Sequence, residues 1–497
     1  MTDVRLSLDL ERSADPVGEG GRAGLGSAWF ALAVLVVVSV FAAIDRQILT
    51  IAIEPVRAAF QLSDVQIGLI QGLGLTLVAA FAGFPLAWLA DRFDRRLILM
   101  VCILGWSAAT AARGFAQDFD HLMIGTIGLA VAEAGLGPIV YSMIPAMFRG
   151  PERARANLIF YSAALIGGAL GMGLAGLAFK VIASSAGAQP EWLRALEPWR
   201  VAFLAAALPG PVLALVVMTI RAEHGRPPSR APALSDAAGA PGTADAPGAA
   251  DAADAADAAD STPGAARAAR HAPALAFLPY LRAHALPLAG LLGAACAASA
   301  AFAPITAWLA PAVSRRFGLS PGDVGVALGG VLGAGVVAGV ALAALAVKLW
   351  GRRHGGILGL RIGQYLAAVS AAAGGLLAVC ASPWMVYAAT GVMFATASAF
   401  FALLPGVWQE VAPATLRARM LAFSGALTTL ATAGAPVLVG VVSERLGTRG
   451  DGLLVAVAVT SAPCMLAAAL LMRAAARPVQ GLLARVRAMD AGQPSGG

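Results

Sequence analysis

The sequence predicts an all-α membrane protein with twelve transmembrane helices in two pseudo-symmetric six-helix bundles. Composition is the first observation: hydrophobic residues make up 59% of the 497 residues and charged residues only 13%, against about 45–50% and about 25% in soluble domains. The second is that the apolar residues occur in runs of about 20, the length that a helix needs to cross a bilayer core of about 30 Å. A soluble globular fold is therefore excluded.

The apolar runs set the order of the predicted helices along the chain. We expect helices at residues 27–53, 67–90, 97–116, 122–146, 157–181, 200–221, 285–312, 323–348, 356–380, 384–408, 416–442 and 452–475. Between the sixth and seventh runs the chain contains an Ala-Ala-Asp repeat with many Pro and Gly residues, a composition typical of disorder. The predicted organisation is a tail (1–26), a first bundle (27–221), a disordered linker (222–284), a second bundle (285–475) and a tail (476–497).

Loop motifs recur in the two halves. The loop after the second run closes with Arg95-Arg96, and the loop after the eighth closes with Arg352-Arg353 at the same offset. The loops after the fourth and tenth runs each contain Arg-Ala-Arg. This repetition predicts two parallel halves of six helices each.

Basic residues predict the orientation. Most Lys and Arg lie in the tails, the linker and the loops on the same side as the tails, whereas the opposite loops, which we take to include Arg113 and Arg315, hold fewer. Both termini are therefore expected to be cytoplasmic. Because Arg far outnumbers Lys and Ala is abundant, as in a GC-rich bacterial genome, the expected membrane is the bacterial inner membrane.

Several kinds of partner are excluded by the same sequence. The net charge is +7, but the basic residues lie at helix ends and form no patch with aromatic residues, so nucleic-acid binding is not expected. The four cysteines fall in separate apolar runs with no paired spacing, which argues against a metal site. We expect no cofactor, a monomer, and contacts with membrane lipids.

Two adjacent charges, Asp45 and Arg46, interrupt the first apolar run. A charge in the membrane core costs about 2.5–3.5 kcal/mol on insertion scales. Neighbouring residues on a helix point about 100° apart, so the two side chains cannot fully satisfy each other. Each needs a cavity or a partner on another helix.

Glu133 lies near the middle of the fourth run, surrounded by small residues and followed by Pro138. A carboxyl group that is neutral when dry, and ionised when wetted or paired with Arg46, can carry a proton. All five histidines fall near helix edges or in the linker, so proton transfer is assigned to Glu133 and Asp45. The alternative is a protonated carboxyl with a structural hydrogen bond.

The loop Asp91-Arg92-Phe93-Asp94-Arg95-Arg96 combines acids with three guanidinium groups. We expect Asp91, Arg92, Arg95 and Arg96 to latch the two halves on the cytoplasmic side in one state and to release them in the other. The simpler alternative is a cluster of charges that only keeps this loop inside.

These motifs resemble those of the major facilitator superfamily. The loop from Ala87 to Arg96 is similar to its signature Gly-x-Leu-x-Asp-Arg-x-Gly-Arg-Arg. Asp94 stands where the signature has its second Gly, and in this the loop resembles that of the spinster-like branch. The branch has an Asp-Arg pair on its first helix and Gly-Glu-Ala on its fourth, which Asp45-Arg46 and Glu133-Ala134 match. Thr126 stands where the branch usually carries an Arg. The resemblance implies a secondary transporter.

The second half is poor in buried charge, and we expect it to line the cavity with Trp308, Gln364 and Tyr365. Such a cavity has charge on one side, from Arg46 and Glu133, and an apolar wall on the other. It suits an amphipathic or lipid-like solute. We therefore expect alternating-access transport of such a solute, coupled to protons.

Four alternatives remain open. Two have the same fold: an organic anion–proton symporter and a drug exporter. Two belong to a different class: a non-transporting membrane sensor and a passive lipid facilitator. The sequence contains no ATP-binding motif and no catalytic constellation, so an enzyme is not expected.

Overall fold

The chain is a multi-pass membrane protein built of helices. Its structure, a computed structural model, describes residues 19–148, 150–185, 190–220, 277–354, 358–413, 416–447 and 452–490. Within these ranges twelve helices are long and apolar enough to cross a membrane, which confirms the predicted number.

The N-terminal half contains the first six spans. Its elements are α2 (Glu19–Phe60), α3 (Asp64–Leu69), the π-helix η1 (Ile70–Leu77), α4 (Val78–Arg92), α5 (Arg95–Gly114), α6 (Phe119–Glu133), α7 (Leu136–Met147), α8 (Gly150–Ser184), α9 (Glu191–Arg194), α10 (Pro198–Ala207) and α11 (Pro209–Met218). The second span is formed by α3, η1 and α4, the fourth by α6 and α7, and the sixth by α10 and α11.

The C-terminal half contains the last six spans. Its elements are α14 (Phe277–Ala283), α15 (Ala285–Phe317), α16 (Pro321–His354), α17 (Leu358–Leu376), the 3₁₀ turn η7 (Leu377–Val379), α18 (Pro383–Glu410), α19 (Arg417–Leu446) and α20 (Gly452–Asp490).

Two boundaries differ from the sequence-based prediction. Residues 222–276 of the predicted linker lie outside the described residues, but its last part is the helix α14 and not a disordered segment. This helix is held to the C-terminal half by Tyr280, whose hydroxyl donates to the carbonyl of Val411 at 2.5 Å. In addition, α20 continues past residue 475, because Val479, Leu482 and Val486 recur on one face and are buried against the same half.

Local chemistry explains where the fourth span breaks. Asp118 caps the first turn of α6 by accepting from the backbone N–H of His121 at 2.8 Å. At the other end, Pro138 has no N–H to donate to the carbonyl of Ala134, so the helix cannot continue regularly through this point. α6 therefore ends at Glu133, and α7 starts at Leu136.

The second span contains an irregular segment that the sequence did not reveal. Over Ile70–Leu77 the helix is wound as a π-helix, with hydrogen bonds five residues apart. The buried Gln71 lies in this segment, and its side-chain amide donates to the carbonyl of Ala307 on α15 at 3.1 Å. The wider winding thus presents a polar group of the N-terminal half to the C-terminal half.

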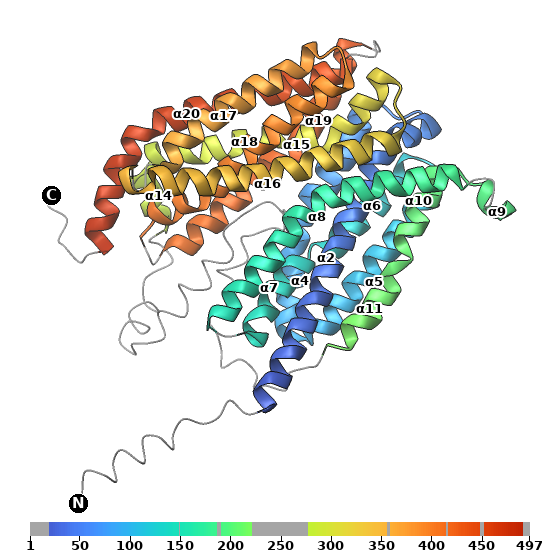
Figure 1. Cartoon of the computed structure of the whole chain (residues 1–497), viewed down its shortest axis with the longest axis horizontal. Coiled ribbons are helices and arrows are strands. Elements are labelled where there is room, and N and C mark those ends of the chain that lie inside the picture. Colours follow the sequence, from blue (N-terminus) through green and yellow to red (C-terminus); the bar gives the residue numbers. More distant parts are fainter. Residues whose placement is uncertain are drawn as a thin grey trace, which may run out of the picture.

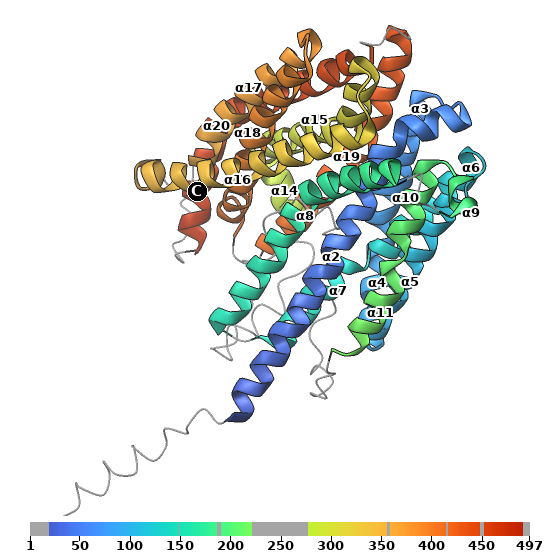
Figure 2. The same cartoon turned by 45° about the vertical axis from the view of Figure 1, so that its right-hand side comes forward.

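The two halves share a hydrophobic core at one end only. One core contains residues of both halves, from Ile48 to Phe203 and from Ile305 to Ala458. Two further cores each belong to a single half. The halves accordingly meet at one end, called the joined end here, and diverge toward the other, the separated end, as Figures 1 and 2 show.

Backbone-to-backbone packing holds the joined end together. Where α8 contacts α16, a Cβ atom added to Gly176 would lie 2.6 Å from the backbone N of Val326. Where α3 contacts α19, a Cβ atom on Gly68 would lie 2.6 Å from the carbonyl oxygen of Pro436. Glycine allows the helices of opposite halves to approach this closely.

This packing predicts that Gly329→Leu opens the joined end. A Cβ atom at Gly329 would lie 2.5 Å from Cα of Gly173 on α8, and overpacking of this kind costs about 1–3 kcal/mol. Such a cost corresponds to a shift of about 5- to 150-fold in the ratio of two conformations. The distance between spin labels at Ala59 and Leu446 should lengthen. Gly330→Leu is the control, since a Cβ atom there has no neighbour within 4 Å; an equal effect of both variants contradicts the prediction.

Candidate functional site

Four charged side chains meet inside the N-terminal half. Asp45 and Arg46 follow each other on α2, and each has its partner on a different helix, as their angular separation requires. Arg113 of α5 lies 2.9 Å from Asp45, between Nη2 and Oδ1. Arg46 lies 3.0 Å from Glu133 of α6, between Nε and Oε2. The site therefore consists of two acid–base pairs that tie together three helices.

Arg113 is the member of this site that sequence reasoning missed. It was counted with the loops opposite the termini, because it falls at the end of an apolar run. Its side chain is instead 1% exposed, and its guanidinium carbon lies 4.7 Å from the centroid of the Phe203 ring. A Cβ atom on Gly125 would lie 2.7 Å from Cγ of Arg113, so a glycine on α6 makes room for this side chain. The buried Thr126 donates only to the carbonyl of Leu122, at 2.8 Å.

Arg46 marks the level at which the shared core ends. On α2, Ala42 belongs to the core of the N-terminal half and Ile48 to the shared core. On α15 the same change occurs between Ala301 and Ile305. The charged site thus lies where the halves begin to part, and the Arg46 side chain is 33% exposed there.

Aromatic side chains occupy the corresponding level of the C-terminal half. Phe302 of α15 is partly buried and packs against both the shared core and the core of its own half. Its ring centroid lies 4.6 Å from that of Phe394 and 6.0 Å from that of Phe401, both on α18. One half therefore presents charge at this level, and the other presents aromatic rings.

Three residues predicted to bind substrate lie elsewhere. Trp308 is fully buried at the joined end, where its indole N–H donates to the carbonyl of Pro436 at 3.0 Å and ties α15 to α19. Gln364 is half-buried and Tyr365 is 67% exposed on α17, which packs between α18 and α20 of its own half. The structure does not bring these side chains together with Arg46 and Glu133, and we leave them out of the candidate site.

The loop predicted to latch the halves makes its contacts within the N-terminal half. The guanidinium of Arg92 lies over the ring of Trp88 at 3.9 Å, and Arg95 donates to the carbonyl of Ser142 at 2.9 Å. Arg96 donates to the carbonyl of Ile220 at 2.8 Å.

The same loop contains two acids, Asp91 and Asp94. Arg96 also pairs with Asp94 at 2.7 Å, and these hydrogen bonds hold the pKa of Asp94 below its ordinary value. The side chain of Asp91 lies outside what the structure describes. In this conformation the described side chains of the loop are released from the other half, and a latch in the opposite conformation remains a prediction.

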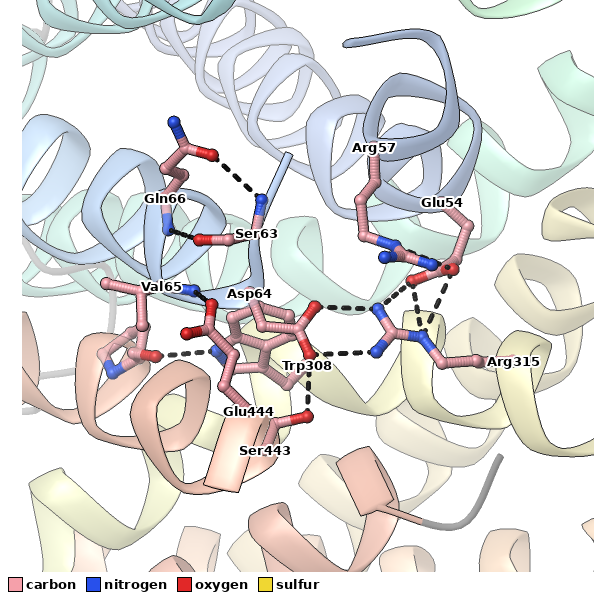
Figure 3. A network of polar contacts seen from close by, with 11 residues as sticks. Glu54, Arg57, Ser63, Asp64, Val65, Gln66, Trp308, Arg315, Ser443 and Glu444 are labelled. Atoms are coloured by element: carbon pink, nitrogen blue, oxygen red, sulfur yellow. Dashed lines mark hydrogen bonds and ion pairs between the residues drawn. The ribbon is translucent and has the colours of Figure 1, made fainter. Parts of the chain in front are cut away.

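A polar network that the sequence did not reveal closes the joined end instead (Figure 3). Arg315 of α15 reaches across to the N-terminal half and binds two carboxylates at once. Its guanidinium lies 2.7 Å from Glu54 of α2 and 2.9 Å from Asp64 of α3. Asp64 also accepts from the hydroxyl of Ser443 on α19 at 2.7 Å. We call these four residues the Arg315 network.

Further contacts between the halves surround this network. The carboxylate of Glu444 on α19 accepts from the backbone N–H of Val65 at 2.9 Å, in the first turn of α3 (Figure 3). An anionic group in the first turn of a helix is stabilising. Lys180 of α8 pairs with Asp323 of α16 at 2.6 Å. The sequence offers one signal for these contacts, the basic residues Lys180 and Arg315. From the sequence alone they indicate only on which side of the membrane a loop lies.

The fold and site together define a membrane transporter built of two similar halves with a charged centre. The chain belongs to the Major Facilitator Superfamily, whose sequence profile matches residues 35–362. This confirms the family that the loop and helix motifs predict.

The similar proteins include an efflux pump and spinster proteins. An MFS-type efflux pump of Mycolicibacterium smegmatis is 28% identical over 238 residues, which are 46% of this chain and 50% of the pump. Protein spinster homolog 1 of Xenopus laevis is 31% identical over 129 residues, 26% of this chain and 24% of that protein. The matched region spans about half of the pump and about a quarter of the spinster protein.

A solved structure covers nearly the whole chain. It is that of a bacterial homologue of the human lysosomal transporter Spinster in an inward-facing, unoccupied conformation. It superimposes with a TM-score of 0.69 at 20% identity and covers 94% of this chain and 99% of its own. The fold is therefore shared, and the spinster-like resemblance agrees with the sequence motifs.

The Arg315 network predicts that Arg315→Gln destabilises the joined end. The substitution removes the charge that bridges Glu54 and Asp64 and leaves Glu54 with its longer contact to Arg57, at 3.6 Å. Hydrogen bonds to charged groups contribute about 1.5–3 kcal/mol each. In a variant without native cysteines, Ala307→Cys in the shared core should then react faster with a membrane-impermeant maleimide. Arg445→Gln, which removes an exposed charge at the same end, is the control. Unchanged labelling in Arg315→Gln refutes the role of the network.

Proposed function

We propose that the protein is a secondary active transporter that moves a small amphipathic or lipid-like solute by alternating access, coupled to protons. The observation that carries this proposal is the Arg46–Glu133 pair. It lies at the level where the halves part, with the Arg46 side chain 33% and the Glu133 side chain 6% exposed. An ion pair at this level costs free energy to place in a membrane, and a cargo site there accounts for it.

Alternating access is supported by how the halves are attached. They share a core only at the joined end, where the contacts are glycine surfaces and the Arg315 network. Each half also has a core of its own, which would stay packed when the joined end separates. Two such rigid bodies can rock about a site between them.

The solute class follows from the unequal surfaces of the two halves. Arg46 offers an anionic group a partly exposed guanidinium. Phe302 and Phe401 offer an apolar chain or ring a partly buried aromatic surface. A solute with an anionic head and an apolar body would contact both surfaces.

Proton coupling is supported by the position of Glu133. A carboxyl group in the membrane core is stable either uncharged or beside a cation. Cargo that competes with Glu133 for Arg46 would therefore favour proton uptake by the carboxyl, and loss of cargo would favour its release.

The orientation is part of the proposal. The first described helix, α2, begins at the separated end, and the last, α20, ends there (Figure 1). With most basic residues on that side, the positive-inside rule makes it cytoplasmic. The protein would then reside in a bacterial inner membrane as a monomer.

A drug exporter of the same fold is a second candidate. The observation that favours it is the match to an efflux pump over 46% of this chain. The acids of the site would then attract a cationic solute, and Arg46 would not be the cargo ligand.

The proposal predicts that Glu133→Gln abolishes driven transport. The test is uptake into proteoliposomes with an imposed pH gradient, using a fluorescent single-chain anionic lipid, gluconate and ethidium as probes. The wild-type protein should accumulate the anionic lipid, and Glu133→Gln should show no accumulation driven by the pH gradient, because its amide cannot take up and release the proton. Exchange of labelled for unlabelled lipid should continue.

The controls separate the candidate functions. Asp120→Asn removes an exposed acid from the same helix and should leave accumulation unchanged. Accumulation of ethidium alone would identify a drug exporter, and flux of lipid that ignores the gradient would identify a passive facilitator. Full accumulation by Glu133→Gln contradicts the proton role.

A further inference from the structure

The two carboxylates of the charged site differ in their surroundings. Asp45 is 2% exposed, and both of its oxygen atoms accept hydrogen bonds. Oδ1 accepts from Nη2 of Arg113 at 2.9 Å, and Oδ2 accepts from the hydroxyl of Thr110. A carboxylate with both oxygens satisfied by charged and polar donors is stabilised as an anion.

Arg113 is confined to this position. It is buried, and its Nη2 also donates to Thr110 at 3.1 Å. The aromatic face of Phe203 lies beside the guanidinium, and Gly125 leaves no side chain in its path. If Asp45 were neutral, Arg113 would be a buried cation without a counter-charge, which is strongly unfavourable.

Glu133 has the opposite surroundings. One oxygen, Oε1, is buried without a hydrogen-bond partner among the described residues. The other lies 3.0 Å from Nε of Arg46, but this nitrogen has no aligned hydrogen bond. The contact is thus held by charge alone, and one partner is partly exposed.

We infer that Arg113 is a positioning residue that keeps Asp45 a permanent anion. Proton exchange then takes place at Glu133, and Arg46 is shared between Glu133 and the anionic group of the cargo. This inference rests on the proposed function and assigns separate roles to its two acids. Among the residues that the structure describes, the charged groups near Glu133 are Arg46 and Asp45 of α2 and Arg113 of α5.

The assignment balances charge in both states of the site. Without cargo, two carboxylates face two guanidinium groups, and the net charge is zero. With cargo, one proton binds to Glu133, one anionic group binds to Arg46, and the net charge is again zero. The loaded site therefore takes up one proton for each monovalent anion and exposes no uncompensated charge to the membrane.

Infrared spectroscopy tests this inference without a transported solute. Spectra of the full chain in phosphatidylethanolamine–phosphatidylglycerol vesicles are recorded as the pH is changed, and the carbonyl stretch of a protonated carboxyl is followed. The wild-type protein should show one such band that titrates near the working pH, where exposed carboxyls, with pKa values of about 4, are already ionised. Glu133→Gln should remove this band.

Two double variants test the role of Arg113. Asp45→Asn with Arg113→Gln keeps the buried charge balanced and should retain the band of Glu133. Arg113→Gln in the Glu133→Gln background should produce a new band, because Asp45 then lacks its cation. Thr110→Val, which preserves the side-chain volume, should leave the titration midpoint of the Glu133 band unchanged and serves if the double variants fail to fold.

The opposite pattern overturns the inference. Loss of the band in Asp45→Asn with Arg113→Gln, its persistence in Glu133→Gln, its absence from the wild-type protein, or a shifted midpoint in Thr110→Val each assigns the proton elsewhere. The proposed function fails separately, when the wild-type protein shows no accumulation driven by a pH gradient.

Discussion

A charge in the low-dielectric interior of a membrane persists only when another charge or water compensates it. This constraint organises the N-terminal half. Arg113 compensates Asp45 and Arg46 compensates Glu133, and the two pairs connect α2, α5 and α6. The contacts that tie these three helices together are therefore also the contacts of the proposed working site. One pair is sealed, and the other reaches the level at which the halves diverge.

The joined end achieves closure by different means. A shared hydrophobic core packs there, glycines bring backbones of opposite halves together, and one guanidinium, that of Arg315, bridges two carboxylates of the opposite half. The ion pairs of this end can exchange partners, whereas its shared core must lose its packing before the halves part. The separate core of each half, one of them around Leu35 and the other around Leu291, keeps it intact when they part.

Physical constraints that act along the chain could be predicted, and those that act between helices could not. The number of spans follows from run length, because the bilayer imposes it. The need of Arg46 for a partner on another helix follows from helical geometry. Arg113 was missed because its position at the end of a run resembles that of a loop residue, and its burial becomes visible only when α5, α6 and α10 are packed together. The exposure of Tyr365 could not be predicted, because the orientation of α17 depends on its packing against α18 and α20.

The π-helix of the second span has a consequence for how motion can be distributed. A segment wound with extra residues per turn can tighten to an ordinary helix, and gaining or losing one residue rotates everything beyond it by about 100°. Such a rewinding at Ile70–Leu77 would rotate α4 relative to α3 and would displace Gln71 from its acceptor on α15. The hydrogen bond between Gln71 and α15, which connects the two halves, can thus be broken by a local rotation of the second span. This rotation does not require the two halves to tilt.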